Sequence, residues 1–219
     1  MQIVIGDVLS AEEIAHACAT LAKVTFEDGR KTAGFAAREV KNNRQAARGH
    51  STDALRTLIE QRILGHEVFR LAVRPKTLTP IMFSAYEPGM NYGSHVDDAL
   101  MQGIRTDVSF TLFLSDPDSY DGGELVIESA SGEDTVKLKA GSMVAYSSTT
   151  LHRVAPVTRG TRLAAVGWAR SFIRDAAQRE LLFDLDTARR QMFAQHGKSA
   201  EYDLVSKSLA NLLRMWAED

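Results

Sequence analysis

Hydrophobic residues recur at helical spacing near both ends of the chain. Residues 2–9 alternate loosely, as in a short strand, and Ser10 with Glu13 forms a capping box that predicts a helix directly afterwards. A second helix, which Ser51 and Asp53 can cap, carries the apolar positions Leu55, Leu58, Ile59 and Ile63. After residue 172, the same spacing predicts two amphipathic helices over about 175–194 and 200–216.

The central part of the chain has a different pattern of hydrophobic and polar residues. From about residue 67 to 172, short runs rich in Val, Phe, Thr and Leu alternate with clusters of Pro, Gly, Asp and Ser. These runs predict strands at 68–73, 81–86, 107–114, 124–128, 134–138, 143–146 and 162–170. Short strands without intervening helices favour two packed antiparallel sheets, a sandwich or jelly roll, over a βαβ fold.

The pattern as a whole predicts an α+β chain in three parts. We expect an N-terminal helical support region at 1–66, a jelly-roll domain at 67–173 and a C-terminal helical region at 174–219. The two C-terminal helices carry apolar stripes that are costly in water, so they should pack on the β domain or form a homodimer contact.

Composition narrows the possible partners. The 219 residues are 44% hydrophobic and 25% charged, and 26 Lys and Arg against 28 Asp and Glu give a net charge of -2, without a general attraction to nucleic acid. The single cysteine, Cys18, cannot form an internal disulfide. The first residues lack a leader pattern and no long apolar run is present, so a cytoplasmic protein without a membrane partner is expected. The expected partner is a small molecule or a protein.

Three residues have the types and spacing of a metal site. If His95 to Asp97 is extended, both side chains lie on one side of the backbone, about 7 Å apart at the Cα atoms. His152 follows the strand-like segment 142–146 and its polar turn, from where a β-sandwich can bring it to the same place. Two histidines and one carboxylate leave coordination positions open, as in Fe(II) enzymes that bind a chelating cosubstrate and dioxygen. A structural zinc site would need four ligands, normally with several cysteines.

An arginine follows at a useful distance from these residues. Arg162 lies ten residues after His152 and opens the predicted strand 162–170. Its guanidinium can bind the distal carboxylate of a dicarboxylic acid through two parallel charge-assisted hydrogen bonds. The order and spacing of these four residues carry more information than any one of them.

These motifs resemble those of a known family. The string His95-Val-Asp97, Asp121-Gly-Gly-Glu-Leu125, Ala140-Gly-Ser-Met-Val144, His152-Arg-Val-Ala-Pro-Val157 and Gly160-Thr-Arg162 resembles the Fe(II)/2-oxoglutarate dioxygenase domain of the prolyl-4-hydroxylase type. Segments outside this domain are similar to the bacterial PKHD-type hydroxylases, namely Thr32-Ala-Gly34, Lys41-Asn-Asn43 and Gly167-Trp-Ala-Arg-Ser-Phe-Ile-Arg-Asp175. The resemblance spans nearly the whole chain and is least specific over the last forty residues.

The resemblance implies a fold, a site and a reaction. The fold would be a double-stranded β-helix with flanking helices, with His95, Asp97 and His152 as iron ligands and Arg162 as the 2-oxoglutarate anchor. The activity would be hydroxylation of a substrate C–H bond with O2, releasing succinate and CO2 from 2-oxoglutarate. Ascorbate is implied as a reductant that restores oxidised iron.

Several residues near these four have two possible interpretations. Tyr86 is the preferred candidate for a cosubstrate contact, ahead of Tyr92, although a buried tyrosine with an ordinary hydrogen bond fits equally well. Ser109 and Thr111, on one strand face with Asp107, either line the cavity or form an exposed polar stripe. Trp168 falls on the same strand side as Arg162 and walls the cavity or packs in the core. Gly122 and Gly123 should permit a tight turn or a close backbone approach. The remaining histidines have no ligand-like spacing: His16, His50, His66 and His196.

Two other functions use the same pattern. A cupin-like jelly roll could hold a metal for another chemistry, although Arg162 argues against it, and a non-catalytic binding module could keep the fold but should have lost a ligand or the arginine. The substrate stays open between a free amino acid, a peptide, a siderophore-like molecule and a protein residue, because loops select it.

Overall fold

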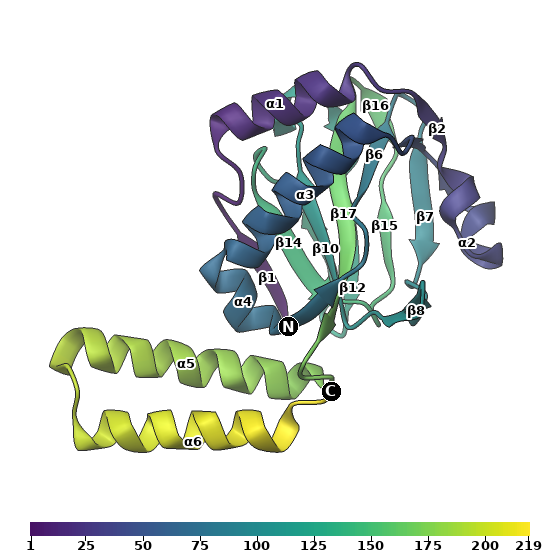
Figure 1. Cartoon of the computed structure of the whole chain (residues 1–219). Helices are drawn as coiled ribbons and strands as arrows, with labels where there is room; N and C mark the ends of the chain where they lie inside the picture. The colour runs from purple at the N-terminus through teal and green to yellow at the C-terminus, as the bar shows by residue number, and fades with distance from the viewer.

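Two antiparallel sheets form the centre of the protein in the computed structural model, which describes residues 1–219 (Figure 1). In spatial order the larger sheet contains β1 (Gln2–Ile5), β14 (Met143–Ser147), β10 (Val108–Phe113), β17 (Arg162–Ser171), β6 (Met82–Tyr86), β4 (Arg44–Ala46) and β2 (Phe26–Asp28), with β5 (Pro75–Leu78) paired to β17. The smaller sheet contains β13 (Gly132–Val136), β12 (Leu125–Ser129), β15 (His152–Val154), β7 (Asn91–His95) and β3 (Lys41–Asn42). Two short ribbons complete the strands: β8 (Leu100–Met101) with β9 (Ile104–Arg105), and β11 (Asp121–Gly122) with β16 (Val157–Arg159).

Alternation along the central strands separates two hydrophobic cores. In β10, Phe110 and Leu112 belong to the core beneath the helices, whereas Phe113 belongs to the core between the sheets. Strand β14 divides in the same way, with Met143 on the helix side and Tyr146 between the sheets. Because successive side chains of a strand point to opposite faces, a strand buried on both faces serves both cores.

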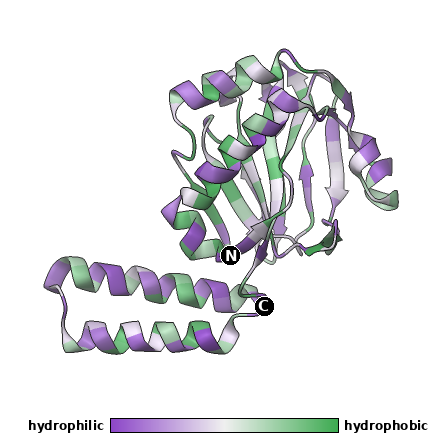
Figure 2. Cartoon of the chain, viewed as in Figure 1, coloured by the Kyte–Doolittle hydropathy of each residue, from purple (hydrophilic) through white to green (hydrophobic).

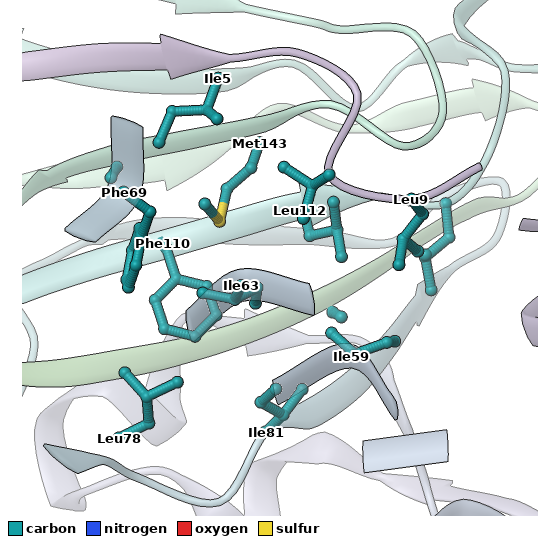
Figure 3. Close-up of a cluster of buried hydrophobic side chains, with 14 of the residues drawn as sticks. Ile5, Leu9, Ile59, Ile63, Phe69, Leu78, Ile81, Phe110, Leu112 and Met143 are labelled. Carbon is teal, nitrogen blue, oxygen red and sulfur yellow. The ribbon is translucent and has the colours of Figure 1, made fainter. Parts of the chain in front are cut away.

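Three helices cover the outer face of the larger sheet: α1 (Ala11–Leu21), α3 (His50–Gly65) and α4 (Glu67–Val73) (Figure 1). Their apolar stripes meet the sheet in a core of 21 buried residues, in which Ile59, Ile63 and Phe69 face Phe110 and Leu112 (Figure 3). The short helical turns η1 (Gly29–Thr32), α2 (Phe35–Glu39) and η2 (Pro117–Ser119) lie in the connections.

Most of the predicted elements are present, and one is wrong. Six of the seven predicted strands correspond to β6, β10, β12, β13, β14 and β17, and the capping box of Ser10 and Glu13 begins α1. The segment 68–73 is not a strand but helix α4, which buries Phe69, Ala72 and Val73 on one side and ends at Arg74 with φ 51°. Val and Phe favour strands, but tertiary packing can override this preference, as it does here. Helix α3 begins after Gly49, earlier than the predicted cap at Ser51 or Asp53.

The first 66 residues contribute strands as well as helices. Strand β1 forms one edge of the larger sheet and β2 with β4 the opposite edge, while β3 forms an edge of the smaller sheet. Strand β3 pairs with β7, with Lys41 opposite Tyr92. The N-terminal region therefore brings polar residues to the space between the sheets.

The C-terminal helices α5 (Ala176–His196) and α6 (Ala200–Trp216) form an antiparallel hairpin that projects from the sheets (Figure 1). Both helices carry hydrophobic and hydrophilic bands (Figure 2), and Ile173, Leu182 and Leu209 form a small core between them. Helix α5 packs against α4, where Asp186, 2% exposed, lies 3.9 Å from Arg74. No helix of the structure is long and apolar enough to cross a lipid bilayer.

Candidate active site

The three predicted metal ligands lie together at one end of the space between the sheets. His95 is the last residue of β7 and His152 the first of β15, and the two are directly opposite each other in the antiparallel pair. Asp97 follows β7 by two residues, and the ligand atoms of all three side chains lie within 4.8 Å of one another. His152 therefore begins a strand of its own, which the sequence pattern did not indicate.

Backbone carbonyls orient both imidazole rings. His95 Nδ1 lies 2.8 Å from the Gly93 carbonyl oxygen, and His152 Nδ1 lies 3.1 Å from that of Thr150. A carbonyl oxygen can only accept a hydrogen bond, so each Nδ1 carries a proton, and the lone pair of a neutral ring is on Nε2. Burial and the neighbouring His152 lower the pKa of His95 to about 4, so its ring is neutral at neutral pH. Neutral imidazole with a free Nε2 is the form that binds a metal.

The carboxylate is held in place by hydroxyl groups. Ser109 Oγ lies 2.6 Å from Asp97 Oδ2 and 2.8 Å from Ser148 Oγ. Because a hydroxyl has one proton, Ser109 donates to the carboxylate and accepts from Ser148. Asp97 Oδ2 also lies 3.7 Å from His152 Nε2. The buried polar face of β10, which the sequence left open between two readings, thus supports the candidate ligand.

Aromatic rings surround the two histidines. The Tyr92 ring is stacked on His95 with 3.6 Å between centroids, and the Tyr146 ring meets His152 edge to face at 5.1 Å. Burial is the main effect that raises the pKa of both tyrosines, and the negative charge of Asp97 raises it further. Both phenols are therefore protonated at neutral pH and can act as donors.

Arg162 is buried without a compensating charge. The side chain is 1% exposed, its Nε has no hydrogen-bond partner, and no carboxylate lies within ion-pair distance. Its guanidinium carbon lies 5.2 Å from the ring centroids of both Tyr86 and Phe113. A buried charge with no counterion is costly, so this group is suited to an anionic ligand. Gly123, with φ 68°, makes room for it, because a Cβ there would lie 3.0 Å from Arg162 Cδ.

Two phenols lie near this guanidinium. Burial raises the pKa of Tyr86, against the opposing effect of the Arg162 charge, so Tyr86 can donate to a carboxylate bound there. Tyr120, whose hydroxyl is buried without a hydrogen-bond partner, is also close enough to Arg162 for that charge to act on its pKa. Tyr120 is not predictable from the sequence, since no spacing rule connects it to Arg162.

One cavity of about 600 Å³ connects these groups, within the size range of small-molecule sites. Its wall includes the three candidate ligands, Arg162 and Tyr86, and also Ser109, Thr111 and Trp168. Trp168 therefore lies at the cavity wall, on the same side of β17 as Arg162. Asp107 does not line the cavity; its carboxylate accepts from Arg105 and from the Ser171 amide. Gly122 permits a close approach, because a Cβ there would lie 2.0 Å from the Pro156 carbonyl oxygen.

Other residues of the wall were missed by the sequence analysis. Lys41 and Asn43 of the N-terminal region and Tyr146 of β14 line the cavity. In the sequence, the string 41–43 contributes to the family resemblance but does not by itself predict a chemical role. The four other histidines, His16, His50, His66 and His196, belong to no cluster of three potential ligands.

In a jelly roll, two histidines and a carboxylate beside a buried arginine in one cavity are characteristic of oxygenases that use Fe(II) and a 2-oxo acid. Residues 81–170 match the model of the 2OG-Fe(II) oxygenase superfamily, and residues 176–218 match that of the PKHD-type hydroxylase C-terminal domain. The chain belongs to the PKHD-type hydroxylases: it is 54% identical to one from Acaryochloris marina and 51% identical to one from Maricaulis maris, each over 100% of both chains.

Solved structures confirm the fold. A Pseudomonas putida prolyl-4-hydroxylase superposes with a TM-score of 0.56 at 23% identity, covering 78% of this chain and 92% of that one. A collagen prolyl hydroxylase of Paramecium Bursaria Chlorella virus-1, solved with 2OG, gives 0.53 at 18% identity, covering 78% and 96%.

The protein is accordingly an Fe(II)- and 2-oxoglutarate-dependent dioxygenase that uses O2. Family membership selects this activity over the cupin-like and non-catalytic alternatives. The role of ascorbate as a reductant is implied by the family resemblance alone.

Proposed function

We propose that His95, Asp97 and His152 hold the Fe(II), and that Arg162 with Tyr86 binds the distal carboxylate of 2-oxoglutarate. The observation that carries this proposal is the buried guanidinium without a carboxylate partner, in the same cavity as the three potential ligands. A dicarboxylic acid fits this arrangement, because one carboxylate can meet Arg162 while the other end of the molecule faces the metal. The donor set fits Fe(II), since three ligands leave positions for a cosubstrate and dioxygen.

The protein residues orient the reactants. When bound, the iron supplies the activation of dioxygen that couples oxidation of 2-oxoglutarate to hydroxylation of a substrate C–H bond. The Gly93 and Thr150 carbonyls hold the two imidazole rings by Nδ1, so that each Nε2 would be free to bind the metal, and Ser109 fixes the Asp97 carboxylate. The aromatic walls around Arg162 exclude water, which strengthens its attraction for a carboxylate.

The substrate is proposed to be a small molecule or a peptide segment. The cavity volume of about 600 Å³ suits a cosubstrate together with a compact side chain or small metabolite. Trp168 and Tyr92 provide flat apolar surfaces against which such a group can lie.

The direct test is purification under argon with Fe(II), followed by incubation with 2-oxoglutarate, O2 and a cell extract. We expect stoichiometric release of succinate and CO2, and a new compound heavier by one oxygen atom than a component of the extract. Mass spectrometry of the extract and quantification of succinate measure both results. Succinate formation that persists when 2-oxoglutarate or iron is left out would contradict the proposal.

We also propose that the α5–α6 hairpin has two faces with different roles. One face is fixed to the oxygenase domain, where Arg190 pairs with Glu67 and the amide of Glu218 donates to the Phe172 carbonyl. The other face is proposed to pair two copies through the exposed apolar side chains Leu204 and Met215, which lie eleven residues apart on one side of α6, away from the buried Leu209.

Light scattering tests the paired form. The wild-type protein should have twice the mass of the chain, and the variant Leu204→Glu/Met215→Glu should have the mass of one chain with unchanged affinity for 2-oxoglutarate, because burying two carboxylates in an apolar contact is unfavourable. A monomeric wild type would refute the dimer while leaving the internal packing of the hairpin intact.

A further inference from the structure

A second buried cation lies in the cavity. Lys41, on the edge strand β3 of the smaller sheet, is 6% exposed and lines the cavity. Its ammonium nitrogen lies 5.0 Å from the centroid of the Tyr92 ring, which in turn is stacked on His95. The ammonium group is therefore one aromatic ring away from a candidate iron ligand.

This ammonium group has one hydrogen-bond acceptor and no counterion. Its nitrogen lies 3.1 Å from Thr32 Oγ1, and no carboxylate lies within ion-pair distance. Of the acidic side chains on the nearby wall, Glu27 pairs with Lys31 and Asp28 with Arg30. Burial lowers the pKa of Lys41 to about 8 despite the attraction of Asp97 and Asp28, so the charge is poorly compensated. An ammonium group has three donors, of which two are free for a ligand.

The cosubstrate does not account for this cation. A bound 2-oxoglutarate has two carboxylates, one for Arg162 and one at the metal. Lys41 lies on the smaller sheet, opposite Arg162 on the larger one, and the Tyr92 ring stands between its ammonium group and His95. The cavity also contains Trp168, whose indole Nε1 is buried without an acceptor. The Lys41 ammonium and the Trp168 indole therefore offer free donors beyond those assigned to the cosubstrate, and these donors call for a ligand that is rich in acceptor oxygens.

Resting on the proposed function, we infer that Lys41 binds a carboxylate of the substrate, so that this hydroxylase acts on an anionic molecule. The carboxylate belongs either to a free organic or amino acid or to a peptide, and both present the same oxygen atoms to the ammonium group. Lys41 is then a residue that determines specificity, and the hydroxylated carbon lies close to a carboxylate in the substrate.

The test compares Lys41→Met, which keeps the length without the charge, with Lys41→Arg, which keeps the charge. Iron content and affinity for 2-oxoglutarate, measured under argon, should equal those of the wild type in both variants. The ligand-free Lys41→Met protein should unfold at a temperature higher by ~2 to 4 °C, because a poorly compensated buried charge is removed. A purely structural role of Lys41 beneath Thr32 predicts a lower temperature instead.

To find the substrate, cell extract is first separated on an anion-exchange column. The retained material is then separated by size through ultrafiltration. We expect the retained fraction to stimulate succinate release by the wild type and the flow-through not to do so. The stimulation should fall about tenfold or more in Lys41→Met, the effect of losing one charge-assisted hydrogen bond, and partly recover in Lys41→Arg. Activity in the filtrate identifies a free acid, and activity in the retentate identifies a peptide or protein.

Several outcomes would overturn the inference. The inference fails if the flow-through stimulates succinate release, or if the retained fraction does not. It also fails if the Lys41→Met variant is stimulated as strongly as the wild type, or if this variant unfolds at a lower temperature than the wild type. A Lys41→Met variant with weaker affinity for 2-oxoglutarate would assign the lysine to the cosubstrate. Failure of the proposed function is distinct, because the wild type would then release no succinate from 2-oxoglutarate under any condition.

Discussion

Alanine at His95, Asp97 or His152 should abolish turnover of 2-oxoglutarate. The three ligand atoms lie within 4.8 Å of one another, and two of them hold Fe(II) poorly and change the geometry of the open positions. The measurement is iron per chain after anaerobic loading, together with succinate release. Both should be lost in each variant while the circular dichroism spectrum is retained.

Two controls make this result specific. His16 is exposed on α1, outside the cavity, so His16→Ala should leave iron content and turnover unchanged. Ser109→Ala should weaken iron binding by about 10- to 100-fold without abolishing it, because it removes only the hydrogen bond that orients Asp97. Wild-type succinate production by any of the three alanine variants would refute that residue as a ligand.

Arg162→Ala should weaken the binding of 2-oxoglutarate by roughly 2 to 5 kcal/mol, the usual cost of breaking a buried charge pair. Arg162 is 1% exposed and flanked by the Tyr86 and Phe113 rings, so a carboxylate bound there would lose its counterion in a site that excludes water. Iron content should barely change. The apparent affinity for 2-oxoglutarate, measured beside iron content, gives the answer.

Three further variants separate charge, shape and volume at this position. Arg162→Lys should recover part of the affinity, because an ammonium group keeps the charge but not the planar pair of donors. Arg162→Met keeps most of the volume without the charge and should bind as weakly as Arg162→Ala. Tyr86→Phe should lose only about 1 to 3 kcal/mol, the contribution of one hydrogen bond to a charged group. An alanine variant with unchanged affinity would refute the anchor, and one that also loses iron would indicate a structural role.

The candidate site could be predicted from the sequence because its residues have a regular local geometry and a fixed order along the chain. His95 and Asp97 are two residues apart, so a nearly extended backbone directs both to one side, and Arg162 begins a strand whose alternation is regular enough to place Trp168 on the same side. The alternation in β10 likewise separates Ser109 and Thr111 from the core residues Phe110 and Leu112.

Other features depend on contacts that no local pattern encodes. Residues 68–73 have strand-forming side chains, yet they form α4 because a helix buries Phe69 and Val73 against the sheet. Strand β15 has three residues, too few for a detectable alternation, and its pairing with β7 places His152 opposite His95. The unpaired state of Arg162 also emerges only when both sheets surround it.

Lys41 is the clearest example of a residue whose position depends on the tertiary structure and not on the local sequence. The amino-acid sequence by itself determined the types and order of the candidate ligands and the alternation of the strands that carry them, since these depend on covalent spacing and backbone geometry. Only the tertiary structure decided that a two-residue strand from the N-terminal region pairs with β7 and brings a lysine beside Tyr92. Such a short strand has no periodicity of its own, because its position is fixed by hydrogen bonds to a partner about fifty residues away.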